Sequence, residues 1–148
     1  MDVVADLACD AEPEEVYAVI ADLTTYPQWL DIVSRVEVDG RAATSDRPTG
    51  WYTDLRGQIG PLRRSKRLRM VRTVDAPDHV RFERDEVDGR RHSDWVLDAS
   101  IAVRDGATVL VMSLHYGGSL WLPVLDRLLA DEIERSRPRL ARLLEEQR

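Results

Sequence analysis

The sequence predicts an α+β fold in which an antiparallel sheet packs against a long C-terminal helix. Residues 34–116 repeat apolar side chains with a period of two between short turn segments, a pattern typical of strands joined by hairpins. Residues 120–148 instead repeat leucines in steps of three and four, which places one apolar stripe on a helix on the order of 35–40 Å long. A helix of that length needs a surface to cover, and a sheet that curls around it is the natural candidate.

Length and composition favour one globular domain. The chain has 148 residues, 43% of them hydrophobic and 32% charged, which is enough for one real core. It contains no run of about 18 apolar residues, so no integral membrane segment is expected. The first residues carry acids where a signal peptide needs a basic and then an apolar run, so a cytoplasmic location is expected. A formal net charge of −6 argues against nucleic acid as a partner.

The predicted elements follow the change in period along the chain. A strand at 2–9 precedes a helix that starts near Pro13, where proline and neighbouring acids suit a first turn. A second short helix or turn covers 24–33. Six further strands and the C-terminal helix complete the order, with the strands predicted at 34–39, 51–56, 63–74, 79–86, 91–103 and 107–116.

Glycine and proline mark the expected interruptions. The segment 57–62 (GQIGPL) is predicted to be a turn from its composition. Pro138 does not suit a helix interior, so we expect a kink or a break at 134–138; the leucines from Leu140 resume the stripe, which favours a kink.

This order of elements, together with its sequence signals, resembles the START-like superfamily, also called SRPBCC, and within it the polyketide cyclase/dehydrase-like group. The residues that carry the resemblance are EPEEVYAVIADL at the first helix, YPQWL at 26–30, Gly50 at a strand start, and the leucine-rich C-terminal helix. The resemblance covers essentially the whole chain. It implies a helix-grip fold, in which a curved seven-stranded antiparallel sheet wraps around the last helix and an elongated cavity lies between them.

The sheet parity and the apolar stripe of the last helix indicate which side chains would line such a cavity, and the resemblance implies that Trp29, on the family's short helix, borders its mouth. Large flat or flexible apolar side chains suit an irregular pocket, although a filled core is the alternative interpretation. The candidate ligand-binding residues are Trp29, Trp51, Leu55, Leu68, Met70, Arg72, Phe82, Arg84, Trp95, Leu97, Met112, Leu114, Tyr116, Leu122, Leu125 and Leu129.

Polar residues on the inward parity allow two interpretations. Lys66, Arg72, Arg84, Ser93 and Thr53 either lie at strand ends that open to water, or contact an oxygenated ligand; Arg72 and Arg84 are the main candidates for the second role. The basic stretch 63–72 is expected to be a solvated strand face, paired with acids of the next strand such as Glu83 and Asp85.

No metal or cofactor site is predicted. Cys9 is the only cysteine and is expected to be a small buried strand residue. His92 and Asp94 are expected on the outer side of one strand, and with His79 and His115 they form no metal-ligand spacing. No catalytic constellation is evident: Ser113 and His115 lie on the outer parity and no nucleophile elbow accompanies them.

The function expected from these features is the binding or transport of a hydrophobic small molecule, a lipid, an aromatic or a polyketide-like compound, between sheet and helix. One alternative is a polyketide aromatase/cyclase, for which Tyr116, Arg72 and Arg84 would guide proton transfers. A second is a protein-interaction module that uses the outer surface. The sequence is compatible with either a monomer or a homodimer.

Overall fold

The computed structural model describes residues 2–40, 48–59, 61–118 and 122–147, without the side chains of 58, 59, 62, 64 and 122–126. The elements along the chain are β1 (Asp2–Cys9), α1 (Pro13–Ile20), the 3-10 helix η1 (Leu23–Gln28), β2 (Val33–Val38), β3 (Gly50–Ile59), β4 (Leu62–Ala76), β5 (His79–Arg84), β6 (Trp95–Arg104), β7 (Ala107–Tyr116) and α2 (Leu122–Glu146). The predicted α+β helix-grip fold is therefore confirmed.

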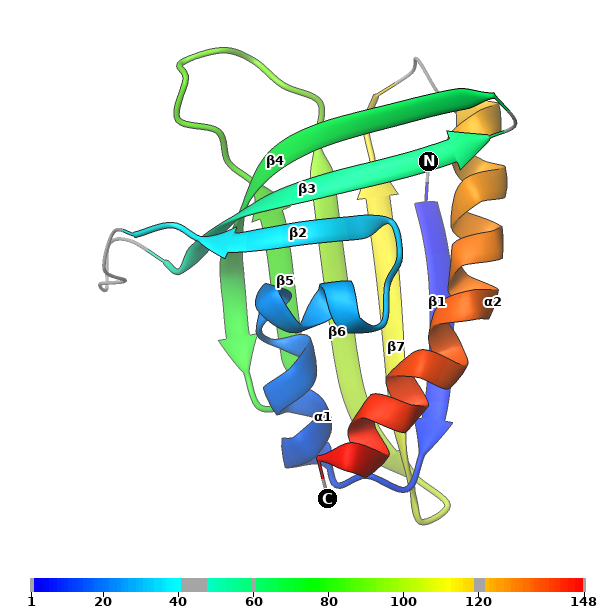
Figure 1. The fold of residues 1–148 in the computed structure, drawn as a ribbon. Helices are drawn as coiled ribbons and strands as arrows, with labels where there is room; N and C mark the ends of the chain where they lie inside the picture. The colour runs from blue at the N-terminus through cyan, green and yellow to red at the C-terminus, as the bar shows by residue number, and fades with distance from the viewer. Residues whose placement is uncertain (1, 41–47, 60, 119–121, 148) are drawn as a thin grey trace.

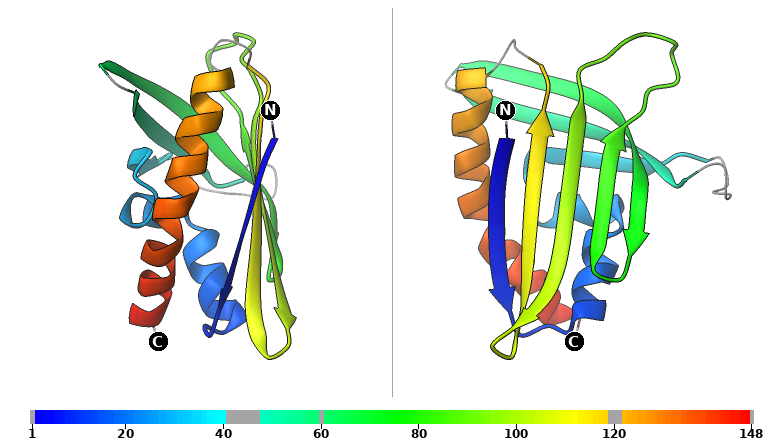
Figure 2. Two further views of the ribbon diagram at one scale, coloured as in Figure 1. Left: turned by 90° about the vertical axis from the view of Figure 1, so that its right-hand side faces the viewer. Right: turned by 180° about the vertical axis from the view of Figure 1, so that it is seen from behind.

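The strands form one seven-stranded antiparallel sheet in the order β1-β7-β6-β5-β4-β3-β2. The sheet curls, and all three helices lie on its concave face (Figure 1). Figure 2 shows the opposite, convex face without a helix on it. The core therefore lies between the concave face and the helices, as the alternating parity predicts.

Helix α1 starts and ends where its sequence allows. Pro13 occupies the first turn with Glu14 and Glu15, near the positive end of the helix dipole. At the other end, Arg72 Nη1 donates a hydrogen bond of 2.8 Å to the carbonyl of Ala21. The cation thereby satisfies a carbonyl that the helix leaves unpaired.

Strand β4 belongs to two parts of the curved sheet. Its second half pairs with β5 from Met70, opposite Arg84, to Ala76, whereas residues 62–69 pair with β3 alone. Figure 1 shows the β3–β4 hairpin extending over the end of the sheet toward the N-terminal end of α2. Close contact with α2 depends on Gly57, where a Cβ would lie 2.7 Å from Cδ2 of Leu128.

Helix α2 continues through Pro138 as one element, and its axis bends in its C-terminal part (Figure 1). The expected kink, rather than a break, is therefore observed. Its stripe buries Leu129, Leu140, Leu143 and Leu144. No helix in the part of the chain that the structure describes is both long and apolar enough to cross a bilayer.

A buried carboxylate fastens α2 to the segment after η1. Glu132 is 1% exposed, and it accepts a hydrogen bond from the backbone N–H of Asp31 and one of 2.8 Å from Arg135 Nη2. The Asp31 side chain in turn pairs with Arg139 of the same helix. These contacts hold η1 and the start of β2 against the helix.

Several predicted boundaries are wrong for local reasons. Gly57 to Ile59 continue β3, so the hairpin turn is shorter than 57–62. Strand β6 starts at Trp95 rather than at 91, and His92 therefore lies in a loop instead of on an outer strand face. The loop has no sheet pairing at His92, and hydrogen bonds of the His92 side chain with Arg84 and Asp88 position it instead.

The expected solvated face of 63–72 is contradicted at Arg69. Arg69 is 5% exposed on the outer side of β4. Its Nε and Nη2 lie 3.0 Å from Oδ2 of Asp39, and its Nη1 donates to the carbonyl of Asp85 at 2.8 Å. Exposed Arg67 instead pairs with Asp54 and Glu37. Of the two acids expected as partners, Asp85, which follows β5, lies 3.8 Å from Arg69, whereas Glu83 pairs with Arg81. The other acids that meet these arginines are Glu37 of β2, Asp39 just after it and Asp54 of β3.

Candidate functional site

An apolar cavity of about 120 Å³ lies between the β1–β7–β6 side of the sheet, η1 and α2. Strand residues form one wall, the segment at the end of η1 a second, and α2 the third. The lining residues are Val3, Ala5, Asp6, Leu7, Tyr26, Trp29, Leu30, Leu97, Leu110, Met112, Ser113, Leu114, Leu129, Ile133, Ser136, Arg137 and Leu140. Apolar cavities of about 150 Å³ admit a benzene ring, so this space suits one ring or a short chain.

Two polar side chains on the cavity wall, those of Ser136 and Arg137, have hydrogen-bond partners within the protein. Ser136 Oγ donates 3.0 Å back to the carbonyl of Ile133, one helical turn earlier. At the rim, Nε of Arg137 in α2 donates a hydrogen bond of 3.2 Å to the backbone carbonyl of Asp6, and Nη2 of Arg137 lies 3.6 Å from the Asp6 carboxylate. Arg137 and Asp6 thus join the edge strand to the helix at the border of the cavity.

A column of aromatic rings closes the cavity on the side of η1. Trp29 lies 4.7 Å from Tyr26 between ring centroids, Tyr26 lies 6.3 Å from Phe82, and Phe82 lies 5.5 Å from Trp51. Tyr26 donates 2.9 Å to the carbonyl of Ile20, and burial raises the pKa of its hydroxyl far above the usual range. Tyr26 and Trp29 border the cavity, whereas Phe82 and Trp51 lie outside its lining.

The predicted ligand-binding residues divide into two groups. The structure brings five of them together on the cavity: Trp29, Leu97, Met112, Leu114 and Leu129. The others with described side chains lie elsewhere on the concave side of the sheet: Trp51, Leu55, Leu68, Met70, Arg72, Phe82, Arg84, Trp95 and Tyr116. The side chains of Leu122 and Leu125 lie outside the described part of the chain.

The two inward arginines have partners within the protein. Besides donating to Ala21, Arg72 lies 3.4 Å from the carboxylate of Asp75 and stacks 5.6 Å from the ring centroid of Trp51. Arg84 donates a hydrogen bond of 3.0 Å to the carboxylate of Glu86 and one of 3.3 Å to the backbone carbonyl of Ser93. Both guanidinium groups therefore hold loops or helices against the sheet.

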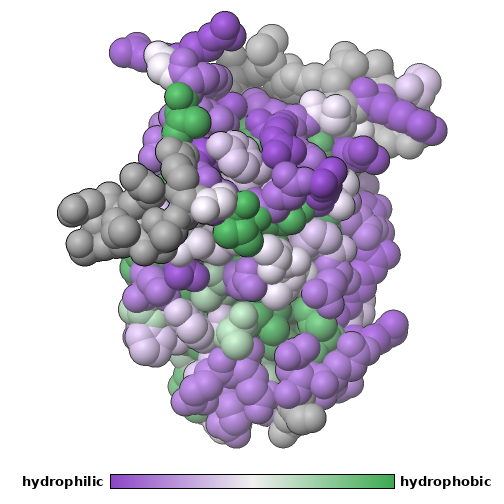
Figure 3. Space-filling view, turned by 60° about the vertical axis from the view of Figure 1, so that its left-hand side comes forward, coloured by the Kyte–Doolittle hydropathy of each residue, from purple (hydrophilic) through white to green (hydrophobic). Residues whose placement is uncertain are grey.

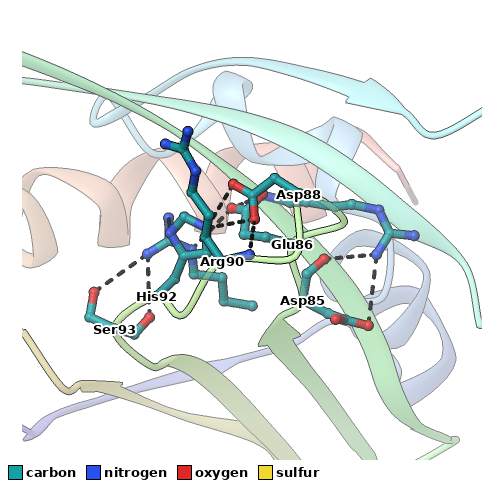
Figure 4. Close-up of polar contacts among 8 residues, drawn as sticks. Asp85, Glu86, Asp88, Arg90, His92 and Ser93 are labelled. Carbon is teal, nitrogen blue, oxygen red and sulfur yellow. Dashed lines mark hydrogen bonds and ion pairs between the residues drawn. The ribbon is translucent and has the colours of Figure 1, made fainter.

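The loop between β5 and β6 contains a chain of charged and polar contacts (Figure 4). Arg84 Nη2 lies 3.2 Å from Nδ1 of His92, and Nε2 of His92 lies 2.9 Å from Asp88. Arginine has no acceptor, so Nδ1 accepts and the proton of a neutral imidazole is on Nε2. The hydrogen bond from the backbone N–H of Arg90 is the main cause that lowers the pKa of the Asp88 carboxyl, and the hydrogen bond with His92 lowers it further.

Three buried donors on the concave side have no hydrogen-bond partner among the residues that the structure describes. They are the indole N–H groups of Trp29 and Trp95 and the hydroxyl of Thr53. An unsatisfied buried donor costs about 1–3 kcal/mol, and such groups mark places where a ligand oxygen would bind favourably.

The predicted set did not include β1 or the part of α2 beyond Leu129, both of which line the cavity. Val3, Ala5 and Leu7 alternate as a strand face should, and Ile133 continues the stripe four residues after Leu129. These signals were present, but which part of the stripe lies over the cavity depends on where the curled sheet meets the helix.

Elsewhere among the described residues, exposed large apolar side chains are scattered. The face shown in Figure 3 is mainly hydrophilic, with small separate apolar patches. The large apolar residues that are exposed, Val4, Val38, Val87 and Val103, come from different elements. Among the described residues, no group of three or more histidine, cysteine or acidic side chains is arranged to hold a metal ion.

The curled sheet, the gripped helix and the apolar cavity together define a helix-grip protein with a fold that binds hydrophobic ligands. Residues 2–145 match the family described as "Polyketide cyclase / dehydrase and lipid transport", and the chain belongs to this family. No match to the sequence was found among curated proteins.

Solved structures agree on the fold. A START superfamily protein from Mycobacterium smegmatis aligns with a TM-score of 0.72 at 18% identity, covering 99% of both chains. A protein from Deinococcus radiodurans aligns with a TM-score of 0.65 at 19% identity, covering 99% of this chain and 97% of the other. The di-domain ARO/CYC StfQ of the steffimycin biosynthetic pathway aligns with a TM-score of 0.69 at 14% identity, covering 99% of this chain and 51% of that one.

Proposed function

We propose that the protein binds an apolar small molecule, of which one ring or a short chain enters the cavity between β1, β6, β7 and α2. The observation that carries the proposal is the cavity itself, whose wall is almost entirely aliphatic and aromatic. Family membership supports a carrier or a cyclase equally. The cavity favours binding, because Ser136 and Arg137 on its wall are already hydrogen-bonded within the protein.

Affinity would come from the apolar area that ligand and cavity remove from water, at about 25 cal/mol per Å² before the costs of association. A preformed cavity reduces those costs, since few side chains need to be ordered on binding. Burial of apolar surface also makes the heat capacity of binding negative, which distinguishes it from a polar surface contact.

The test is titration of the protein with 4-phenylbutan-1-ol by calorimetry at several temperatures. The wild-type protein should bind with a negative heat-capacity change. Ala5→Phe should abolish binding, because Ala5 lines the cavity and a phenyl ring there would fill it. Ala8→Phe is the matched control, because Ala8 lies on the exposed side of the same strand. Equal binding by both variants, or no binding by the wild type, would refute the proposal.

A further inference from the structure

A pair of aromatic residues lies next to the cavity on the concave face of the sheet. Leu97 pairs with Leu114 on the cavity wall, and the next inward pair along β6 and β7 is Trp95 with Tyr116. Two residues along a strand span about 6.6 Å, so this aromatic pair lies one short step beyond the cavity. Their ring centroids are 4.8 Å apart, and both residues are buried.

A lysine from the β3–β4 hairpin lies close to this aromatic pair. Lys66 lies in the part of β4 that pairs with β3 alone, in the hairpin that extends over the end of the sheet (Figure 1). Its Nζ is 6.0 Å from the ring centroid of Trp95 and 6.0 Å from that of Tyr116. Within the described part of the chain, the side-chain ammonium of Lys66 forms no ion pair and no hydrogen bond.

The charges near Lys66 leave a local excess of positive charge. Arg84 and Glu86 are the charged groups that act on it, and they pair with each other at 3.0 Å. Partial burial and the nearby Arg84 cation lower the pKa of the Lys66 ammonium. A ligand anion would be favoured at this position, because it would stabilise the charged ammonium against both its partial burial and the Arg84 cation.

The second group is the indole N–H of Trp95. Trp95 is 8% exposed, and its Nε1 is buried without a hydrogen-bond partner among the described residues. A carboxylate oxygen accepts from both an ammonium and an indole N–H, and hydrogen bonds that involve charged groups are about twice as strong as neutral ones.

We propose that the ligand is an amphiphile whose anionic end, a carboxylate, binds between Lys66 and Trp95 while its apolar end occupies the cavity beside Leu97 and Leu114. This inference rests on the proposed binding function and adds the chemical class of the ligand. It also gives the ligand a direction along β6 and β7, with its charged end toward the β3–β4 hairpin.

Two ligands of equal shape test the inference. 4-Phenylbutyrate and 4-phenylbutan-1-ol share a ring of the size of the cavity and a short chain, and differ in the charge at the chain end. We expect the wild-type protein to bind the carboxylate more tightly in calorimetric titrations. Lys66→Gln should weaken 4-phenylbutyrate by about tenfold, the loss that corresponds to one charge-assisted hydrogen bond, and change 4-phenylbutan-1-ol by less than about twofold.

Matched variants separate the local contact from general effects. Arg67→Gln removes the same charge from the neighbouring position, but Arg67 lies on the other face, paired with Glu37 and Asp54. It should leave both affinities unchanged. Trp95→Phe keeps a ring and removes the N–H, and should weaken the carboxylate several-fold more than the alcohol; unchanged urea unfolding of this variant shows that it is folded.

The outcomes are distinct. Equal binding of the two ligands by the wild-type protein, with no effect of Lys66→Gln, would overturn the inference and leave the proposed cavity binding intact. Equal losses in Lys66→Gln and Arg67→Gln would also overturn it, because the effect would then be one of net charge. Failure of 4-phenylbutan-1-ol to bind the wild-type protein would refute the proposed function, and the inference with it, whereas failure of 4-phenylbutyrate alone would overturn only the inference.

Discussion

The guanidinium of Arg69 lies directly against Gly50 on the outer face of the sheet. A Cβ at Gly50 would be 3.1 Å from Nη2 of Arg69 and 3.4 Å from its Cζ, closer than nearly all real contacts of that kind. The absence of a side chain at Gly50 thus leaves the space through which Arg69 reaches Asp39. The glycine that starts β3 is therefore explained by the buried ion pair on the neighbouring strand.

Removing the charge of Arg69 should destabilise the fold strongly. Arg69→Met removes the buried cation of the Arg69–Asp39 ion pair, and breaking a buried pair by removing one partner costs about 3–5 kcal/mol. Arg67→Met is the control on the same strand, because Arg67 is half exposed and its ion pairs should contribute less than about 1 kcal/mol. Urea unfolding of both variants measures the difference, and equal losses would show that the burial of Arg69 has no energetic consequence.

The buried Glu132 gives a second prediction about stability. Glu132→Leu removes the acceptor of the Asp31 backbone N–H and should lower the free energy of unfolding by about 1–3 kcal/mol. Glu132→Gln keeps an oxygen that can accept this hydrogen bond and loses only the half-exposed Arg135 ion pair, so it should lose less than about 1 kcal/mol. If glutamine were as damaging as leucine, the contact with Asp31 would not be the cause.

The Asp31–Arg139 pair predicts a pH dependence. The hydrogen bond from Arg139 lowers the pKa of the Asp31 carboxyl below its ordinary value of 3.8. A group whose pKa is lower in the folded state contributes stability above its unfolded pKa and loses this contribution as the pH falls through its folded pKa. Asp31→Asn should therefore be less stable than wild type at neutral pH, with the gap closing below pH 3.8.

Urea unfolding across this range measures the gap. Both side chains are about half exposed, so the difference at neutral pH should not exceed about 1 kcal/mol. A gap that persists or widens in acid would mean that the effect of Asp31 does not come from its charge.

The contact between Arg137 and Asp6 should control entry to the cavity. Arg137→Gln loosens the border between β1 and α2, and losing a surface ion pair worth up to 1 kcal/mol raises the population of an open edge by at most about fivefold. Stopped-flow tryptophan fluorescence should show faster association of 4-phenylbutan-1-ol. Glu134→Gln, which loses a 2.8 Å contact with Arg137 but none with the strand, should leave the rate unchanged. A slower rate in Arg137→Gln would contradict this role.

The period of two predicted the faces of the sheet correctly. Trp51, Leu68, Phe82 and Trp95 are all buried on the concave side, as alternation requires. The same alternation failed at Arg69, because a strand pattern describes one strand and the partner of Arg69 comes from Asp39, 30 residues earlier.

The position of the cavity could not be predicted in the same way. Inward parity is shared by Leu97, which lines the cavity, and by Phe82, which packs against Tyr26 and Trp51. The two differ only in what lies above them, and this depends on how η1 and the bend of α2 fill the curled sheet. Side-chain volume and tertiary packing decide that, and neither leaves a periodic signal in the sequence.

Nuclear magnetic resonance of the protein titrated with 4-phenylbutan-1-ol tests the central claim most directly. Trp29, Leu97, Met112 and Leu114 line the cavity, and the indole N–H of Trp29 and the methyl groups of the other three give signals that report on it. Their signals should shift together and saturate, while the methyl signals of Val4 and Val103, exposed in β1 and β6, should not move. Shifts confined to Val4 and Val103, with the cavity signals unchanged, would contradict the claim that the space between sheet and helix holds the ligand.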